Sequence, residues 1–190
     1  MAPSLSPHIK ALIAKARIVS FAGWHEQFGE AAIAALQAAD DERVYLNDEL
    51  LETLPAGPIA RSLRDHASPI VDTARARVLS QFPGITEPGG GLYPAFRAEA
   101  CWRDFWHFLR CITYGIAAQR TDYTSAIGLA HMEQLYRELQ VPLDAMVFGL
   151  TSLKSVSQEQ LAAVDVHISQ EQLFPYFDHL IDALSQFKSR

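Results

Sequence analysis

The 190-residue sequence predicts an all-α protein, and three observations favour this fold class. Apolar residues recur at steps of three and four along most of the chain, which is the spacing of one face of an α-helix. The alternation of apolar and polar residues that marks a half-buried strand is nearly absent. Proline and glycine gather in short clusters, which divide the chain into about seven to nine helical stretches.

The first half of the chain contains four predicted helical stretches. Leu12 and Val19 lie on the apolar face of the first. Asp40 suits the start of the third, because helix N-termini favour negative charge. Pro55 ends that helix, and Pro69 is expected to interrupt the fourth. The four stretches cover residues 7–20, 24–39, 40–55 and 59–82.

The second half contains the longest unbroken stretch. Prolines and glycines exclude a helix between residues 83 and 91. Pro142 suits a first helical turn, where no backbone N–H donor is needed. Capping boxes are expected at residues 157–160 and 169–172, and Pro175 lies near the start of the last helix or kinks it. The predicted helices cover residues 95–119, 122–139, 142–156 and a last stretch ending near residue 187.

Composition excludes several classes of function. The net charge of −6 argues against nucleic-acid binding, which needs basic patches to neutralise phosphates. No apolar run reaches the roughly 18 residues of a membrane span. No signal peptide is visible, so a cytoplasmic protein is expected. Two cysteines are too few for a disulfide framework.

Common catalytic motifs are also absent from the sequence. It has no His-Glu-x-x-His, Cys-x-x-Cys, phosphate-binding glycine loop or Gly-x-Ser-x-Gly element, so no enzyme is expected. His107 and His131 fall in the middle of predicted helices. Either is a candidate axial ligand in a haem globin or sensor, and the alternative is a partly buried histidine with a hydrogen-bond partner.

The helix over residues 95–119 carries the candidate site. At 100° per residue, one stripe collects a guanidinium, a thiol and a carboxylate beside aromatic rings, which is not typical of a core. The alternative is that Arg97 and Arg103 pair with acidic neighbours on a solvated face. Trp102 and Leu109 lie on the opposite face and suit the core. The stripe consists of Arg97, Cys101, Asp104, Phe108 and Cys111.

The run from residue 85 to 117 resembles the phycobiliproteins, most closely an allophycocyanin β-type subunit. A Pro-Gly-Gly turn at Pro88, a Cys-x-Arg-Asp element at Cys101 and a Leu-Arg-x-x-Thr-Tyr run ending at Tyr114 carry the resemblance. It covers about residues 70–157 well and the last helix loosely. It implies a single globin-like domain over residues 1–190, with an N-terminal helical extension, residues 1–40, and a globin core, residues 59–190.

The resemblance also implies a bilin, an open-chain tetrapyrrole such as biliverdin or a phycobilin. The thiol of Cys101 would form a thioether to it, and the carboxylate of Asp104 would accept hydrogen bonds from pyrrole N–H groups. Arg97 and Arg103 would hold the propionates, and guanidinium groups suit carboxylates well. The same two arginines are expected to favour the reactive thiolate of Cys101.

Three aromatic residues complete the predicted bilin site. Phe108 belongs to the same helical stripe as the thiol and the carboxylate. Tyr114 and Tyr136 are candidate walls of the pocket, and each suits the core equally well.

The sequence departs from the light-harvesting members of the family. Extra residues lie around 40–62, and Gly91 stands where asparagine is usual. Phe96 replaces one of two neighbouring arginines, and Arg17 stands where an acidic residue pairs the subunits. These departures suggest a non-antenna relative similar to the bilin biosynthesis-associated globins, acting as a carrier or accessory protein.

Partners follow from this interpretation. The apolar face of residues 7–20 is a candidate homodimer surface. Haem oxygenase, bilin reductase or a lyase would be the enzymes that the protein meets. Two alternatives remain: an interaction protein with a vestigial pocket that docks on one of these enzymes, and a haem-binding globin.

Overall fold

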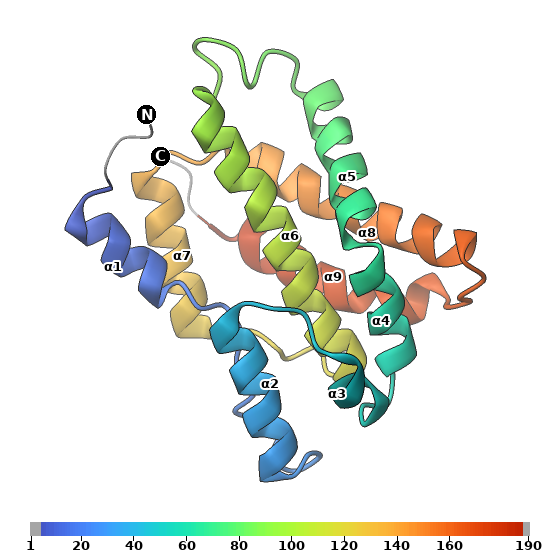
Figure 1. Ribbon diagram of the computed structural model, residues 1–190. Coiled ribbons are helices and arrows are strands. Elements are labelled where there is room, and N and C mark those ends of the chain that lie inside the picture. Colours follow the sequence, from blue (N-terminus) through green and yellow to red (C-terminus); the bar gives the residue numbers. More distant parts are fainter. Residues whose placement is uncertain (1–4, 188–190) are drawn as a thin grey trace.

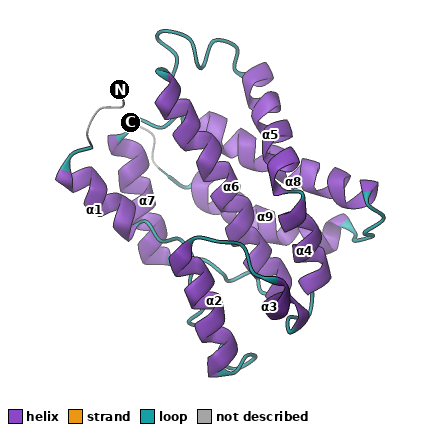
Figure 2. Cartoon of the chain, viewed as in Figure 1, coloured by secondary structure: helices purple, strands orange, loops and turns teal. Residues whose placement is uncertain are grey.

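The computed structural model describes residues 5–187 and consists of helices joined by turns and loops (Figures 1 and 2). Within this range the only strand-like pairing is a bridge between Val19 and Thr124, so the all-α prediction is confirmed. The helices are α1 (Pro7–Lys15), α2 (Glu30–Glu42), α3 (Asp48–Glu52), α4 (Gly57–Asp65), α5 (Ala67–Gln81), α6 (Ala95–Ala118), α7 (Ala126–Glu138), α8 (Leu143–Ala163) and α9 (Gln170–Ser185).

Helix α6 runs through the middle of the molecule, and α4, α5, α8 and α9 pack around it (Figure 1). Every residue from 108 to 118 is buried, because this half of α6 has neighbours on all sides. Gly149 of α8 lets the two helices approach closely. A Cβ atom there would lie 2.1 Å from the ring of Phe105, so any side chain would displace that ring.

The segment between α1 and α2 is irregular, although the prediction gave helix to residues 7–20 and 24–39. Helix α1 ends at Lys15, and α2 begins only after Gly29. Between them Phe21 and Trp24 bury their rings in the core, with centroids 4.9 Å apart. Tertiary packing of these two rings therefore overrides the helical pattern of the local sequence.

Asp40 lies in the last turn of α2 and does not start the following helix, contrary to the prediction. Its carboxylate accepts hydrogen bonds from Arg17 at 2.8 Å and from Arg110 at 2.9 Å. Helix α3 begins instead at Asn47, whose side chain accepts from the backbone N–H of Leu50 at 2.9 Å. The negative charge of Asp40 is thus paired with two arginines and does not stabilise the N-terminus of a helix.

The other predicted helix boundaries show a similar mixture of agreement and difference. The capping box at Ser169 is present, whereas Ser157 is fully buried inside α8. The chain breaks between α4 and α5 at His66, and Pro69 lies within the first turn of α5, where proline is tolerated. Pro175 lies inside α9, so this helix begins before the proline.

Helix α1 does not present a free apolar face. It packs against α7, with Leu12 buried and His8 within 2.9 Å of the Glu138 carboxylate. The expectation of a homodimer surface on residues 7–20 is therefore wrong for Leu12. Of the helices between residues 5 and 187, none is both long and apolar enough to cross a membrane.

Replacing Asp40 by alanine tests the importance of the buried charge cluster. The change leaves Arg110, which is 4% exposed, without its carboxylate, so we expect the free energy of unfolding to fall by about 3 to 5 kcal/mol. Urea unfolding followed by circular dichroism measures this loss. Asp41→Ala is the matched control, because Asp41 is exposed and its carboxylate lies 3.5 Å from Arg17. Equal stability of both variants would contradict a structural role for the cluster.

Candidate functional site

A cavity of about 800 Å³ lies between α6 and the N-terminal segment, with α7 along one side. All five residues of the predicted stripe line it, so the guanidinium, the thiol and the carboxylate do share one wall. The opposite face of α6 faces the core, and neither Trp102 nor Leu109 lines the cavity. The α6 wall includes Arg97, Cys101, Arg103, Asp104, His107, Phe108 and Cys111.

Cys101 lies on this wall with only 4% of its surface exposed. Burial raises the pKa of its thiol to about 12, and the nearby Asp104 carboxylate adds to the increase. Arg97 and Arg103 lower the pKa, but by less than burial raises it. Arg97 and Arg103 therefore favour the thiolate, as predicted, but desolvation of the thiol outweighs their charge, so the thiol remains protonated at neutral pH.

Asp104 is held by a neighbouring helix. Its Oδ2 atom accepts a hydrogen bond of 2.8 Å from the hydroxyl of Tyr136 on α7, and Tyr136 also lines the cavity. Burial raises the pKa of Asp104 to about 6, although Tyr136 and Arg103 favour the ionised form. The carboxylate is therefore ionised at neutral pH and becomes protonated under mildly acidic conditions.

The two predicted carboxylate-binding arginines lie in different environments. Arg97 donates to the backbone carbonyls of Gly91, at 3.1 and 3.2 Å, and of Gln140, at 3.0 Å, so it ties together two loops. Arg103 is exposed and forms no hydrogen bond or ion pair with any residue in the described range. The alternative in which both arginines pair with acidic neighbours is not found there.

The structure separates the three aromatic residues that were predicted for the site. Phe108 and Tyr136 line the cavity, and both are buried. Tyr114 does not line it and is fully buried, so of the two alternatives for this residue the core is found and the pocket wall is not. Its hydroxyl accepts a hydrogen bond of 2.6 Å from Arg110 and donates to the carbonyl of Val44, which places it in the buried charge cluster.

Of the two mid-helix histidines, only His107 lines the cavity. Its Nδ1 atom lies 3.4 Å from Nε of Arg110. Burial, followed by the charge of Arg110, lowers the pKa of His107 to about 4, so the ring is neutral at physiological pH. Across the described part of the chain, no group of three or more His, Cys, Asp or Glu side chains is arranged to hold a metal ion.

Sequence reasoning does not predict the wall opposite α6. This wall comes from the N-terminal segment and from α7, and no periodic pattern links these residues to the motif on α6. The one sequence feature that points to this wall is Arg17, which stands where the family has an acidic residue. In the structure Arg17 forms an ion pair with Asp40. The wall includes Ile13, Ala16, Arg17, Ile18, Asp40, Arg43, Met132 and Leu135.

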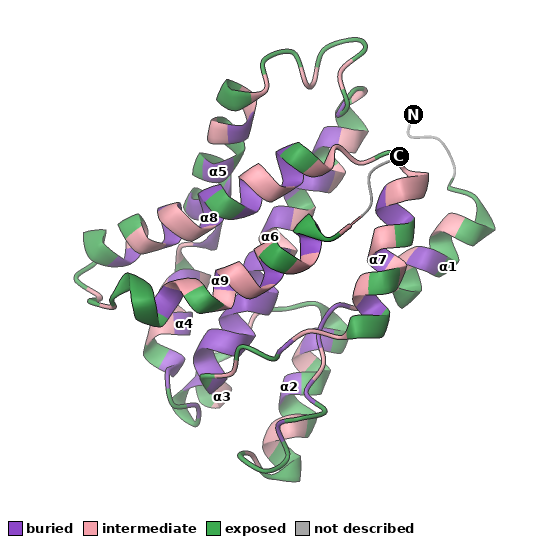
Figure 3. Cartoon of the chain, turned by 180° about the vertical axis from the view of Figure 1, so that it is seen from behind, coloured by how far each residue is buried: buried purple, intermediate pink, exposed green. Residues whose placement is uncertain are grey.

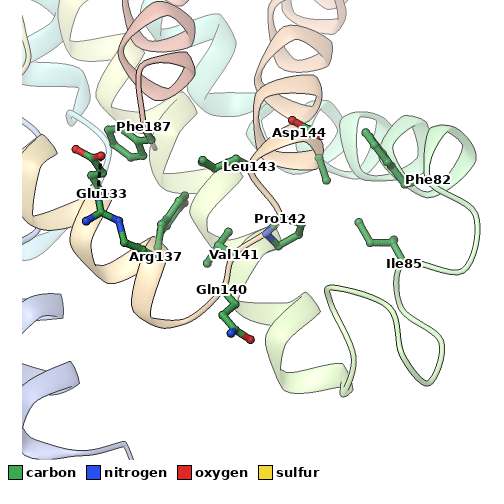
Figure 4. A pocket seen from close by; sticks show the side chains of 12 residues that line it. Phe82, Ile85, Glu133, Arg137, Gln140, Val141, Pro142, Leu143, Asp144 and Phe187 are labelled. Carbon is green, nitrogen blue, oxygen red and sulfur yellow. Dashed lines mark hydrogen bonds and ion pairs between the residues drawn. The ribbon is translucent and has the colours of Figure 1, made fainter. Parts of the chain in front are cut away.

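A second cavity of about 460 Å³ lies next to the first, where α7 ends and α8 begins (Figure 4). Phe82 and Ile85 border it, and the paired side chains of Glu133 and Arg137, 2.8 Å apart, line another side. Tyr136, Val141 and Pro142 border both cavities, so the two cavities are adjacent at these residues. No cysteine lines this second cavity, and the larger one is therefore the candidate site.

Comparison with known proteins agrees with this architecture. The allophycocyanin subunit alpha-B of Nostoc sp. is 32% identical over 155 residues, which cover 77% of this chain and 94% of that protein. The allophycocyanin alpha chain of Mastigocladus laminosus is 31% identical over the same shares of the two chains. These relatives are α-type chains, whereas the motif run suggested a β-type subunit.

A solved structure and a family model give the same result. The structure is a far-red fluorescent biliprotein derived from an allophycocyanin F subunit of the thermophilic cyanobacterium Chroococcidiopsis thermalis. It matches with a TM-score of 0.63 and 25% identity, over 68% of this chain and 95% of that one. The model described as phycobilisome protein matches residues 34–184. The chain therefore belongs to the phycobilisome protein family.

Proposed function

We propose that this protein binds a bilin in the α6 cavity and acts in the cytoplasm as a carrier or accessory protein of bilin biosynthesis, not as an enzyme. One observation carries the proposal: a single cavity wall presents the thiol of Cys101, the carboxylate of Asp104 and the guanidinium of Arg103. This set matches the ethylidene or vinyl group, the pyrrole N–H groups and the propionates of an open-chain tetrapyrrole.

The shape and lining of the cavity support the fit. Its volume of about 800 Å³ lies in the range of small-molecule sites, about 300 to 1,000 Å³. Phe108 and Leu135 offer apolar surface to the pyrrole rings. The carboxylate of Asp104 accepts hydrogen bonds from N–H donors, and charge-assisted bonds of this kind are the strong ones. When bound, the bilin would supply absorption of visible light.

Covalent attachment is a separate part of the proposal. The thiol of Cys101 would add across an exocyclic carbon–carbon double bond, with sulfur bonding to one carbon and the proton passing to its neighbour. This addition needs no oxidant. Because the pKa of this thiol is about 12, little thiolate exists at neutral pH, and attachment without a lyase would be slow.

The N-terminal segment supports a carrier over an antenna subunit. The position where an acidic residue would pair two subunits holds Arg17, and its guanidinium is bound by Asp40 of the same chain. We propose an N-terminal extension, residues 1–40, on a globin core, residues 59–190; the family match covers residues 34–184 and so includes most of this core.

A homodimer is the assembly that we propose for the carrier, with haem oxygenase or bilin reductase as transient partners. Helix α2 is the supporting feature, because it projects from the helical body and is mostly exposed (Figures 1 and 3). Its outer face carries four exposed alanines, Ala31, Ala34, Ala35 and Ala38.

Haem is the second candidate ligand, and one observation favours it. His107 is neutral and lines the cavity, as an axial ligand to iron requires. A haem protein would show a sharp Soret band that disappears in the His107→Ala variant. A bilin protein would instead bind biliverdin more tightly than haem.

Titration of the purified apoprotein with biliverdin and with phycocyanobilin tests the proposal directly. We expect a saturating band that is shifted to the red of the free pigment, because the cavity holds the rings in one extended conformation. Absorption spectroscopy measures this band. No spectral change with either pigment would overturn the proposed function and favour a protein that only docks on an enzyme.

The Cys101→Ala variant separates attachment from binding. We expect it to lose all pigment that survives denaturation and to keep reversible binding, since Asp104 and the arginines remain. A denaturing gel with zinc-enhanced fluorescence detects the covalent product. Cys111→Ala is the matched control, because this thiol also lines the cavity. Loss of reversible binding in Cys101→Ala alone would contradict these separate roles.

The pKa of Asp104 predicts a pH dependence. Since the carboxylate must be ionised to accept pyrrole N–H groups, affinity for biliverdin should fall as pH drops through about 6. Between about pH 7.5 and pH 5 the expected decrease is about tenfold, by linkage to one proton. Fluorescence-quenching titrations at each pH measure it. In Asp104→Asn the decrease should be much smaller, and an equal decrease would assign the titration to another group.

A further inference from the structure

The large cavity is positively charged although the chain is acidic overall. Five arginines and three acidic residues line it, so the lining carries two more positive charges than negative ones when all are ionised. The whole chain has a formal net charge of −6. The excess of positive charge is therefore local to this site, and it matches a ligand with two carboxylates.

Three of the five arginines already have partners within the protein. Arg17 and Arg110 bind the carboxylate of Asp40, and Arg97 binds two backbone carbonyls. The guanidinium groups of Arg43 and Arg103 form no hydrogen bond or ion pair with any residue between 5 and 187. These two residues are thus available to a ligand.

The backbone of Arg43 is held firmly in place. This residue caps the C-terminal end of α2 in the left-handed conformation, with φ 57° and ψ 40°. Its N–H donates to the carbonyl of Asp40 at 2.9 Å, and Asp40 is itself anchored by Arg17 and Arg110. The side chain of Arg43 is exposed and borders the cavity from the wall opposite α6.

Arg43, at the end of α2, and Arg103, on α6, lie near the same groups of the α6 wall. Both border the cavity, and the positive charges of both lower the pKa values of Asp104 and His107. A ligand that lies against Asp104 and His107 would therefore be close to both guanidinium groups. Phe96, which stands where a further arginine was expected, also borders the cavity and supplies no charge there.

We propose that Arg43 binds a carboxylate of the ligand, and that Arg43 and Arg103 together select tetrapyrroles that carry two free carboxylates. This inference rests on the proposed bilin-binding function and adds a residue to it. Arg43 lies far before the α6 motif in the sequence, among the extra residues around 40–62. The motif alone therefore assigns it no role.

Biliverdin and its dimethyl ester test this role, because the ester keeps the pyrrole rings and lacks the carboxylates. We expect the wild-type protein to bind biliverdin more tightly than the ester. Arg43→Gln should lose about tenfold in affinity for biliverdin, the effect of one charge-assisted hydrogen bond at a solvated site. The same variant should bind the ester as the wild type does, and Arg43→Lys should recover part of the loss.

Arg75→Gln is the control, since Arg75 is exposed, lines neither cavity and changes the net charge equally. Its affinity for both pigments should be unchanged. An Arg43→Gln variant that binds both pigments as the wild type does, or that weakens both equally, would overturn the role of Arg43. A wild-type protein that binds neither pigment would overturn the proposed function itself, and the role of Arg43 with it.

Discussion

The candidate site depends on one buried interaction, the carboxylate of Asp40 between the guanidinium groups of Arg17 and Arg110. Asp40 and Arg110 are buried and Arg17 is partly buried, and the cost of burying a charge is offset only when it has well-placed partners. Here the cluster joins the segment after α1, the end of α2 and the middle of α6. It therefore fixes the N-terminal segment at the distance from α6 that leaves a cavity between them.

Burial then determines the chemical state of the groups on the α6 wall. Desolvation disfavours the charged form of every side chain, so it raises the pKa of Cys101 to about 12 and of Asp104 to about 6, and lowers that of His107 to about 4. At neutral pH the thiol and the imidazole are uncharged, whereas the carboxylate of Asp104 is ionised. The wall thus places a protonated thiol beside an anionic acceptor, with Arg97 and Arg103 on the same wall.

The sequence predicts the α6 wall well and the opposite wall poorly, for a physical reason. In a long helix without proline, the spacing of two residues in the sequence determines the angle between them around the helix axis. The stripe from Arg97 to Cys111 therefore follows from the rotation of 100° per residue. The opposite wall depends on where Trp24 and Asp40 are buried, which no local pattern contains. The same limit applies at Tyr114, for which the sequence leaves pocket wall and core equally open, and whose hydroxyl accepts a hydrogen bond from Arg110 in the buried cluster. The charges of Arg97 and Arg103 beside Cys101 follow from the sequence, whereas the burial that raises the pKa of this thiol does not.

Tyr136 combines two tasks that proteins often give to separate residues. It borders both cavities, as Val141 and Pro142 do, and its hydroxyl donates a hydrogen bond to the carboxylate of Asp104. Any rotation of this side chain would break that hydrogen bond and change the lining of both cavities at once. The position of the Tyr136 side chain therefore links the shape of the smaller cavity to the surroundings of the Asp104 carboxylate in the larger one.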